Sequence, residues 1–361
     1  MFCNDTALRI TSTIPNGLIP GTVMVGRRTG PPLMVSDNPE IVTAKGPKVI
    51  WLHPESHNNN GEHRVFLWSV NGTGSDGVIG ITIQNTGSSN LNITSIRFGE
   101  GQDPPENGVA IGQCLADLLL NGLFAPENPS AFLVAPGQIQ VVSQFNWPQN
   151  RLIGAFIAFS VDQTAQYTLR SVYGPTGTDL TKLDSTTPMS VDTVHKHPRG
   201  SWEYSECEVN CGTFYINEGG RWNGKYYKLL ADKNSSKAMI PFDRDDSWNK
   251  PESIDNRAPF GAVLHVHVPI INHCKSDIPL RFMLQAWGGT QKTSTGVTGT
   301  PYTGAVRMTD HSVWTIPTTL SFPNAAILTH PIYLAPPGKS QFDFDLAVGG
   351  ESSAPARLIV F

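Results

Sequence analysis

The stretch Val78-Ile-Gly-Ile-Thr-Ile-Gln84 indicates the fold class of the whole chain. After its first residue, large apolar side chains alternate with small or polar ones, which is the period of a β-strand with one buried face. Residues 85–90, Asn-Thr-Gly-Ser-Ser-Asn, form a polar turn signal, and alternation resumes at Leu91. Two short alternating segments joined by such a turn predict an antiparallel hairpin.

The second strand of this predicted hairpin changes face along its length. Leu91 and Ile93 point to one side of a strand, whereas Ile96 and Phe98 point to the other. Because strand side chains alternate strictly, an extra residue is needed between the two pairs. We therefore expect a β-bulge near Ser95.

Strand-like segments recur along most of the chain. Residues 48–52 and 64–68, for example, are short runs rich in β-branched and aromatic residues. Helical spacing is found only from Val109 to Leu123, where apolar residues recur three and four positions apart. One helix that caps or bridges a sandwich fits this pattern, whereas an α/β fold with repeated β-α units does not.

The two halves of the sequence share landmarks in the same order. Asn85 and Asn272 each end an alternating strand and begin a small polar turn before another apolar strand. The segments 131–137 and 331–338 both close on a Pro-Gly turn and lead into an alternating strand. Each half ends on a strongly apolar strand, over 152–161 and 356–361 respectively. These matches predict an internal duplication of a sandwich.

A chain of 361 residues exceeds a comfortable single domain. We predict an all-β protein of two tandem β-sandwiches, Ig-like or jelly-roll-like, with one short helix in the first. The expected parts are an extended Pro/Gly-rich N-terminal arm over 1–44, a first sandwich over 45–172, a linker over 173–199 and a second sandwich over 200–361. The arm is expected to lie against the first sandwich or to pair with a neighbouring molecule.

The charge composition argues against some classes of function. The chain has 26 Lys and Arg against 30 Asp and Glu, without the cluster of positive charge that nucleic acid requires. We therefore predict no nucleic-acid partner. Nor does any stretch approach the ~20 apolar residues of a transmembrane helix. The first residues, Met-Phe-Cys-Asn-Asp, do not form a signal peptide, so we expect a cytoplasmic protein or a mature exported form with an added Met.

The run from Arg64 to Gly74, Arg-Val-Phe-Leu-Trp-Ser-Val-Asn-Gly-Thr-Gly, precedes a strand and the Asn85 turn. This pattern resembles secreted and cell-surface β-sandwich proteins of Gram-positive spore-forming bacteria, which often carry copper amine oxidase N-terminal-like repeats. The closing residues, 354–361, are similar to the end of their sandwiches. The resemblance covers about half of the chain in scattered pieces and implies secretion and envelope association without enzyme activity. Neither the accessory repeat nor a signal peptide is recognised in this sequence.

Two histidines are placed to share a metal ion. His265 and His267 are two apart on a predicted strand, so their side chains project from one face about 6–7 Å apart. Neutral imidazoles suit Zn or Cu, with a third ligand from His273 or an Asp. Alternation alone also explains both residues as the solvated face of a strand, and we favour that interpretation.

Three other polar segments are weaker candidates. His195 and His197 repeat the same spacing in the linker, His53, His57 and His63 surround an Asn-rich loop, and residues 243–246 read Asp-Arg-Asp-Asp. The linker pair lies in flexible backbone beside a lysine, the Asn-rich loop is typical of a solvated hairpin tip, and the acidic run lacks the ordered spacing of a calcium loop. For each we favour a solvated segment over a ligand site.

Aromatic residues gather between positions 202 and 227, and Trp202, Tyr204, Trp222 and Tyr226 are the candidates for a binding surface. Exposed aromatics near Asn and Asp stack on sugars and contact proteins. A sandwich core or a seam between domains uses the same residues, and we favour that use.

The five cysteines allow a local disulfide between Cys207 and Cys211, which lie four apart in a turn-like segment. Their spacing is not that of a redox Cys-x-x-Cys, and the chain has neither a Gly-x-Ser-x-Gly elbow nor a Gly-rich phosphate loop. We therefore predict no enzyme activity and no cofactor.

The sequence favours a non-catalytic secreted or surface structural protein whose sandwich edges pair with further copies or with other surface proteins. A virion or tail component is a variant of this hypothesis. The alternative from another class is a carbohydrate-binding or glycan-processing module, which would use the aromatic and acidic loops and take glycans as partners.

Overall fold

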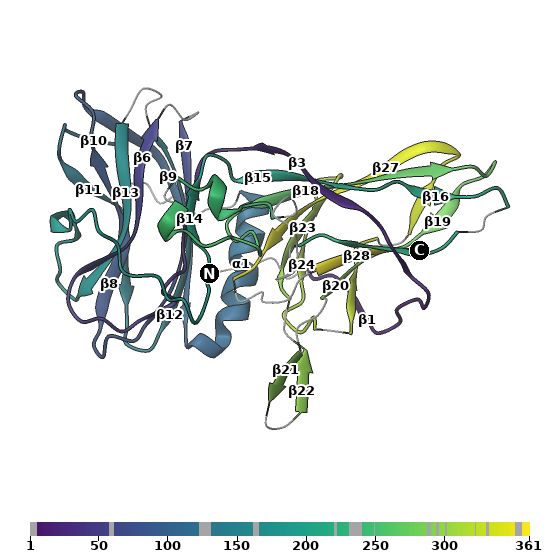
Figure 1. Cartoon of the computed structure of the whole chain (residues 1–361), viewed down its shortest axis with the longest axis horizontal. Helices are drawn as coiled ribbons and strands as arrows, with labels where there is room; N and C mark the ends of the chain where they lie inside the picture. The colour runs from purple at the N-terminus through teal and green to yellow at the C-terminus, as the bar shows by residue number, and fades with distance from the viewer. Residues whose placement is uncertain are drawn as a thin grey trace.

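The computed structural model describes residues 6–57, 61–122, 131–161, 166–219, 222–230, 240–248, 250–286, 290–293, 296–299, 302–321, 323–329, 332–350 and 356–361. The predicted all-β class is confirmed: strands dominate, and the described part contains one α-helix, α1 (Gly108–Asn121). Two β-sandwiches lie end to end with α1 between them (Figure 1). This helix is not long and apolar enough to cross a bilayer, and neither is any other helix in the described ranges.

The first sandwich is built from two sheets. One sheet has the order β10 (Phe132–Val134), β9 (Leu91–Asp103), β12 (Leu152–Val161), β7 (Glu62–Asn71), β4 (Leu33–Ser36) and β14 (Arg199–Trp202), with β5 (Ile41–Val42) also on β7. The other has the order β11 (Ile139–Trp147), β8 (Gly77–Asn85), β13 (Gln166–Pro175) and β6 (Lys48–His57). The pairs are antiparallel except that β4 and β5 run parallel to β7.

The second sandwich also has two main sheets. One has the order β24 (Val313–Ile316), β23 (Gly304–Met308), β27 (Gly338–Val348), β18 (Val263–Asn272), β15 (Glu206–Cys211) and β3 (Val23–Thr29), with β16 (Phe214–Ile216) on β18. The other has the order β1 (Ile10–Thr11), β25 (Ala325–Ile327), β20 (Phe282–Ala286), β28 (Ala356–Val360), β17 (Lys225–Lys228) and β2 (Ile19–Pro20).

Smaller elements complete the chain. Two strand pairs form separate small sheets: β19 (Ile278–Leu280) with β26 (Tyr333–Ala335), and β21 (Thr290–Thr293) with β22 (Gly296–Gly299). The 3-10 helices among the described residues are η1 (Pro105–Asn107), η2 (Leu180–Lys182), η4 (Arg244–Asp246) and η5 (Lys250–Glu252).

The hairpin predicted around residues 85–90 is wrong, although both of its strands form. β8 pairs with β11 and β13, whereas β9 belongs to the other sheet, so the turn carries the chain from one sheet to the other. Both strands bury alternate side chains in the core between the two sheets, which satisfies the same alternation as a hairpin. The predicted bulge is confirmed, because Ser95 has φ 51° and the register against β12 shifts beside it.

Asn85 and Asn272 hold the equivalent turns with the same hydrogen bonds. Nδ2 of Asn85 donates to the carbonyls of Ser89 and Val134, both at 2.7 Å, and its Oδ1 accepts from the Gly87 amide at 2.9 Å. Nδ2 of Asn272 donates to the carbonyls of residues 276 and 335 at 3.0 and 2.9 Å, and its Oδ1 accepts from the amide of residue 274 at 2.9 Å. The landmarks behind the predicted repeat therefore have the same local structure.

The predicted helix is confirmed, and it bridges the two sandwiches. Gly122 ends α1 in the left-handed conformation at φ 65°, with its amide bonded to the Leu118 carbonyl. Ile111, Leu115 and Leu118 contribute to the large core cluster, which includes residues of both sandwiches. On the same helix, Ala116 and Leu120 pack in a smaller cluster with strands of the second sandwich. The helix that the sequence places in the first domain is therefore shared.

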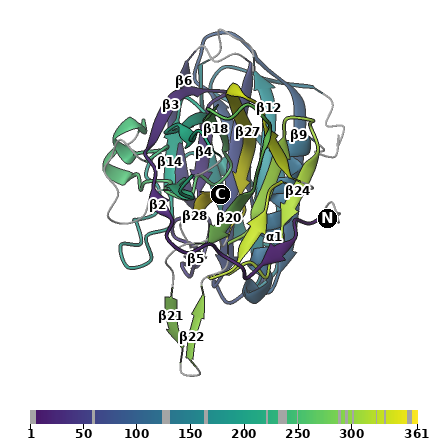
Figure 2. The same cartoon turned by 90° about the vertical axis from the view of Figure 1, so that its right-hand side faces the viewer.

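The N-terminal arm, expected on the first sandwich or on a neighbouring molecule, is divided: residues 10–29 pack on the second sandwich, and residues 33–42 join the first. β3 pairs with β15, β2 with β17 and β1 with β25. The purple segment consequently runs along the second sandwich before β4 and β5 join the first (Figures 1 and 2). The predicted linker is ordered against the first sandwich at Met189, whose amide donates to the Val49 carbonyl, and it ends in β14.

The central strands of the first sandwich serve two cores. β7 and β12 are buried on both faces over most of their length. Val65 and Ile153 pack between the two sheets of the first sandwich, whereas Phe66 and Phe156 face α1 and the second sandwich. The continuous apolar sequence of these strands follows from this double burial. One hydrophobic core thus extends across the junction of the sandwiches.

Candidate functional site

His265 and His267 project from β18 on the face that points away from the core, because the apolar residues beside them are fully buried. They lie opposite Asp345 and Asp343 on β27. His265 Nδ1 is 2.6 Å from Asp345 Oδ1, and His267 Nδ1 is 2.9 Å from Asp343 Oδ1. Each imidazole is therefore oriented by its own cross-strand carboxylate.

Both ring nitrogens of His265 contact carboxylates. Its Nε2 is 3.4 Å from Oε2 of Glu206 on β15. The hydrogen bonds with Asp345 and Glu206 outweigh burial and raise the pKa of His265 to about 9. The ring is thus protonated at neutral pH, and a protonated imidazole has no lone pair for a metal ion. A metal ion at His265 would have to displace this proton, and a site shared by His265 and His267 stays a prediction.

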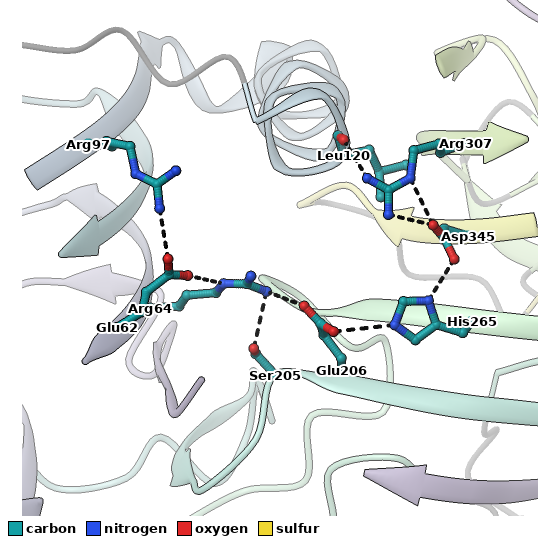
Figure 3. Close-up of polar contacts among 9 residues, drawn as sticks. All are labelled: Glu62, Arg64, Arg97, Leu120, Ser205, Glu206, His265, Arg307 and Asp345. Carbon is teal, nitrogen blue, oxygen red and sulfur yellow. Dashed lines mark hydrogen bonds and ion pairs between the residues drawn. The ribbon is translucent and has the colours of Figure 1, made fainter. Parts of the chain in front are cut away.

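Glu206 continues a chain of alternating charges into the first sandwich (Figure 3). Its Oε1 lies 3.1 Å from Nη1 of Arg64 on β7. Arg64 Nε donates to Glu62 Oε1 at 2.9 Å, and Arg97 Nη2 donates to Glu62 Oε2 at 2.8 Å. Side chains from both sandwiches are therefore joined by consecutive ion pairs.

At its other end the chain reaches α1. Arg307 on β23 donates to Asp345 Oδ2 through Nε at 2.8 Å and Nη2 at 2.6 Å. Its Nη1 donates to the carbonyl of Leu120 at 3.0 Å. Leu120 lies in the last turn of the helix, where carbonyls lack intrahelical partners. Arg307 thus links the charge chain to the bridging helix (Figure 3).

The carboxylates of this chain are held ionised by their partners. The hydrogen bond with His265 lowers the pKa of Glu206 against the effect of burial, and Arg64 lowers it further. Burial alone would raise the pKa of Asp345, but the hydrogen bonds from His265 and Arg307 outweigh it and the pKa is lowered. These half-buried pairs each contribute about 1 kcal/mol or less, so their main effect is to select one arrangement of the two sandwiches.

A cavity of about 500 Å³ opens beside the charge chain. Its ionisable lining residues are His265, His267, His311, Arg307, Asp343, Asp345 and Glu208. The residues that line it include no serine, cysteine or lysine, so threonines supply its only hydroxyl groups. The arrangement can bind a polar molecule through charge and hydrogen bonds.

The charge chain is the part of the site that sequence reasoning missed. The two histidines alternate on their strand as expected, but their partners lie about 60 and 80 residues away. One signal was present: Asp343-Phe344-Asp345 has the same period of two as His265-Val266-His267. Opposite charges of equal period on two strands indicate a cross-strand pairing.

Of the four aromatic candidates for a binding surface, one is buried and three are half-buried. Trp202 is fully buried and donates through Nε1 to the Asp243 carbonyl at 2.8 Å, so its candidacy is corrected. Tyr204 and Trp222 are half-buried against the large core. Tyr226 is half-buried, and the Arg357 guanidinium carbon lies 5.0 Å from its ring centroid. These positions support the other interpretation, in which the aromatic residues pack in a sandwich core or between the two domains.

The predicted disulfide between Cys207 and Cys211 is wrong: both are buried free thiols. They lie on one strand, β15, where four residues span about 13 Å, well beyond the reach of a disulfide. Burial raises the pKa of each thiol to about 12, so neither is a nucleophile at neutral pH. Cys274 is also free, whereas Cys114 on α1 is disulfide-bonded.

The histidines near the Asn-rich loop are largely internal, not solvated as we had expected. His53 and His63 are fully buried, with ring centroids 5.0 Å apart. His63 Nδ1 lies 3.0 Å from the Tyr167 hydroxyl, and burial lowers the pKa of His63 to about 3. The rest of this candidate, the His57 side chain and residues 58–60, lies outside what the structure describes.

The acidic segment at 243–246 forms a structured turn. Asp243 caps η4 by accepting a hydrogen bond from the Asp245 amide at 2.8 Å. Asp246 pairs with Arg28 of β3 at 2.7 Å. The segment therefore joins the arm to the second half of the chain.

No family model matches this chain, and no curated protein matches it. The chain is similar to the PBSX exported protein XepA at 9% identity, with 96% of this chain and 88% of that chain covered and a TM-score of 0.15. It is similar to the STIV MCP at 9% identity, with coverages of 87% and 94% and a TM-score of 0.14. Likenesses at these TM-scores carry no argument about fold or function. Membership of the secreted surface proteins that the sequence resembles stays a prediction.

Proposed function

We propose that this chain is a non-catalytic structural protein that assembles outside the cell by pairing the edge strand β11 with β11 of a second copy. The observation that carries the proposal is the sequence of this edge, Ile-Gln-Val-Val-Ser-Gln-Phe-Asn-Trp over 139–147. It has no charged residue, proline or glycine, the features by which natural edge strands avoid pairing with other molecules.

The other long edge strands carry such protection. β6 contains Lys48, Pro54 and Glu55. β3 contains Gly26 followed by two arginines, and its register against β15 shifts there. β11 has only a register shift between Val141 and Ser143, which leaves its second half regular.

Further edges are covered by other parts of the chain. Residues 6–8 exchange backbone hydrogen bonds with Thr315 on β24. The amides of Trp248 and Ile254 donate to carbonyls of β14. At β11, the described contact on the outer side is Gln102 Nε2, which donates to the Asn146 carbonyl at 2.7 Å. An incoming strand could displace this exposed side chain.

A second copy suits this edge. Two identical strands that run antiparallel about a twofold axis form a closed, isologous interface. Nine residues span about 30 Å, enough for a continuous ladder across two sheets. Gln144 and Asn146 are exposed and uncharged, so the two copies would not repel each other at this edge.

The extracellular part of the proposal is supported by the disulfide at Cys114, because disulfides persist mainly in oxidising compartments. Burial of Trp202 takes one of the four aromatic candidates away from the glycan-binding alternative.

The proposal is tested by multi-angle light scattering across a hundredfold concentration range, with electron microscopy of the same samples. We expect dimers for the natural chain and monomers for the double variant Gln144→Lys, Asn146→Lys. Gln149→Lys adds the same kind of charge in the adjoining turn and should assemble normally. A natural chain that is monomeric at every concentration overturns assembly, and an unaffected double variant overturns the role of β11.

A further inference from the structure

We infer that Asp37, Glu40 and His197 form a site for a divalent transition-metal ion of the zinc type, which fastens the connector between the sandwiches to the first sandwich. This site lies away from β11 and does not depend on the proposed assembly. One donor atom from each residue lies within 4.8 Å of the other two. His197 Nδ1 is 3.6 Å from Asp37 Oδ2, and its Nε2 is 3.1 Å from Glu40 Oε2.

The two segments that supply these donors are held together by other contacts. Asp37 and Glu40 lie between β4 and β5, which both pair with β7. Between them, Asn38 is fully buried and accepts from the Asp192 amide at 2.8 Å through Oδ1. Its Nδ2 donates to the carbonyls of Asp192 and His195 at 3.0 and 3.1 Å. The donors are therefore brought together by the fold, which lowers the cost of ordering them around an ion.

A second anchor lies beside the first. Arg199 is fully buried, and its Nη1 donates to the Asn38 carbonyl at 3.1 Å and to the Met189 carbonyl at 2.9 Å. Its Nη2 donates to Glu252 at 3.1 Å. This arginine fixes the backbone next to the three donors, while its ion pair goes to another carboxylate.

The charge of the site favours a cation. Asp37 has a side-chain exposure of 3% and Glu40 of 20%, so both carboxylates are largely removed from water. Two carboxylates carry two negative charges, and an imidazolium at His197 would offset one of them. A divalent ion would neutralise both carboxylates and release any proton held by His197.

The donor set points to the kind of ion. One imidazole nitrogen and two carboxylate oxygens match the three protein ligands of zinc sites in which water takes the fourth position. Calcium requires six to eight oxygen ligands, which three side chains with one nitrogen do not supply. Because the ion competes with a proton for His197, affinity should fall as the pH is lowered.

The consequence of binding is mechanical. His197 lies two residues before β14, and Lys196 beside it is exposed. An ion on His197 would tie this exposed backbone to the β4–β5 segment. The bond after Lys196 is thus expected to become resistant to trypsin when the ion is present.

Binding is tested by isothermal titration of ZnCl₂ into the full chain after dialysis against a chelator, with CaCl₂ as the comparison ion. We expect zinc to bind at one tight site that is lost in His197→Gln and weakened at least tenfold in Glu40→Gln. His195→Gln is the matched control, because His195 is two residues away and its side chain is 70% exposed. Equal zinc binding by all the chains, no tight zinc binding by the natural chain, or tighter binding of calcium would overturn the site.

Limited proteolysis gives a second readout. Zinc should slow trypsin cleavage after Lys196 in the natural chain and leave cleavage after Lys182, whose side chain is 81% exposed, unchanged. The protection should vanish in His197→Gln and persist in His195→Gln. Equal slowing at both lysines would mean that zinc acts on the protease, and protection in His197→Gln would exclude His197 as a ligand.

Discussion

His265 is the residue through which pH acts on the junction of the sandwiches. Its pKa of about 9 in the folded chain lies above its ordinary value of 6.5, so its stabilisation is complete below about pH 6.5 and is lost as the pH rises through 9. We expect His265→Gln to lower the free energy of unfolding by about 1–2 kcal/mol at pH 6, discounted for partial exposure, and by little at pH 10. Urea denaturation at pH 6, 8 and 10 measures this difference.

His267→Gln is the matched control for that experiment. His267 has a similar side-chain exposure, 28% against 27%, but it pairs with a single carboxylate, Asp343. Its loss should cost about 0.5 kcal/mol or less. A loss in His265→Gln that stays constant from pH 6 to pH 10 would contradict the role of its charge.

His63 gives the opposite dependence on pH. Its pKa of about 3 lies below the ordinary value, so protons bind the unfolded chain more readily and stability falls as the pH drops from about 6.5 towards 3. One such group contributes a slope of up to about 1.4 kcal/mol per pH unit. In His63→Phe the new ring can stack on Phe159 as His63 does, and the free energy of unfolding should fall less steeply as the pH is lowered.

Urea denaturation between pH 4 and pH 7 checks this prediction. At pH 7 the variant should be about 1 kcal/mol less stable, because the hydrogen bond with Tyr167 is lost. Its disadvantage should shrink as the pH falls. Parallel stability curves for the two chains would show that His63 does not carry the acid sensitivity.

For single residues, the sequence predicts whether a side chain is buried or exposed better than it predicts which residues the side chain contacts. Alternation on the strand placed His265 and His267 on its outer face, as the structure has them. The same argument failed for Cys207 and Cys211, because a turn was assumed where a regular strand carries both inward. Matching periods of opposite charge can indicate that two strands pair, but the registers that bring Asp345 and Arg64 to their partners involve strands distant in the sequence.

Among the elements, the N-terminal arm has the largest effect on the second sandwich. The two main sheets there have β24, β3, β1 and β2 at their edges. Three of these strands come from residues 10–29, and residues 6–8 cover the fourth through Thr315. The arm thus closes, within one molecule, edges that would otherwise be open to pairing.

Deletion of residues 1–29 should therefore expose both sheets of the second sandwich and cause aggregation. A synthetic peptide of residues 6–29, added during refolding, should restore soluble protein, whereas a scrambled peptide of the same composition should not. Size-exclusion chromatography and circular dichroism measure the outcome. A truncated chain that remains soluble and folded without the peptide would show that the arm is dispensable for closing the sheets.

The elements also show where local prediction stops. The strands at 78–84 and 91–98, the bulge at Ser95 and the helix after residue 108 were all predicted from periodicity. The way in which the strands at 78–84 and 91–98 pair was not predicted correctly. A polar turn of six residues can join two adjacent strands of one sheet, and it can equally connect strands of two different sheets. Buried Asn85 favours the crossing, since its amide reaches the carbonyl of Val134 on a third strand.

For the whole molecule, the shared core makes the two sandwiches a single unit. The apolar runs of β7 and β12 predict burial on both faces, but not that α1 and a second sandwich would cover the outer face. At the closest approach, a methyl group on Gly112 of α1 would lie 2.2 Å from the carbonyl oxygen of Gly350. The absence of a side chain at this position lets helix and second sandwich meet.

Gly112→Ala should for this reason loosen the junction. Alanine favours a helix over glycine by about 1 kcal/mol, so any loss of stability must come from the contact with Gly350. We expect one calorimetric unfolding transition for the natural chain, and a lower or divided transition for the variant. Ala110→Gly, at an exposed position of the same helix, should lose about 1 kcal/mol and keep a single transition. A single unfolding transition of Gly112→Ala at a higher temperature would contradict this prediction. It would show that the close contact between α1 and Gly350 is not needed for the two sandwiches to unfold together.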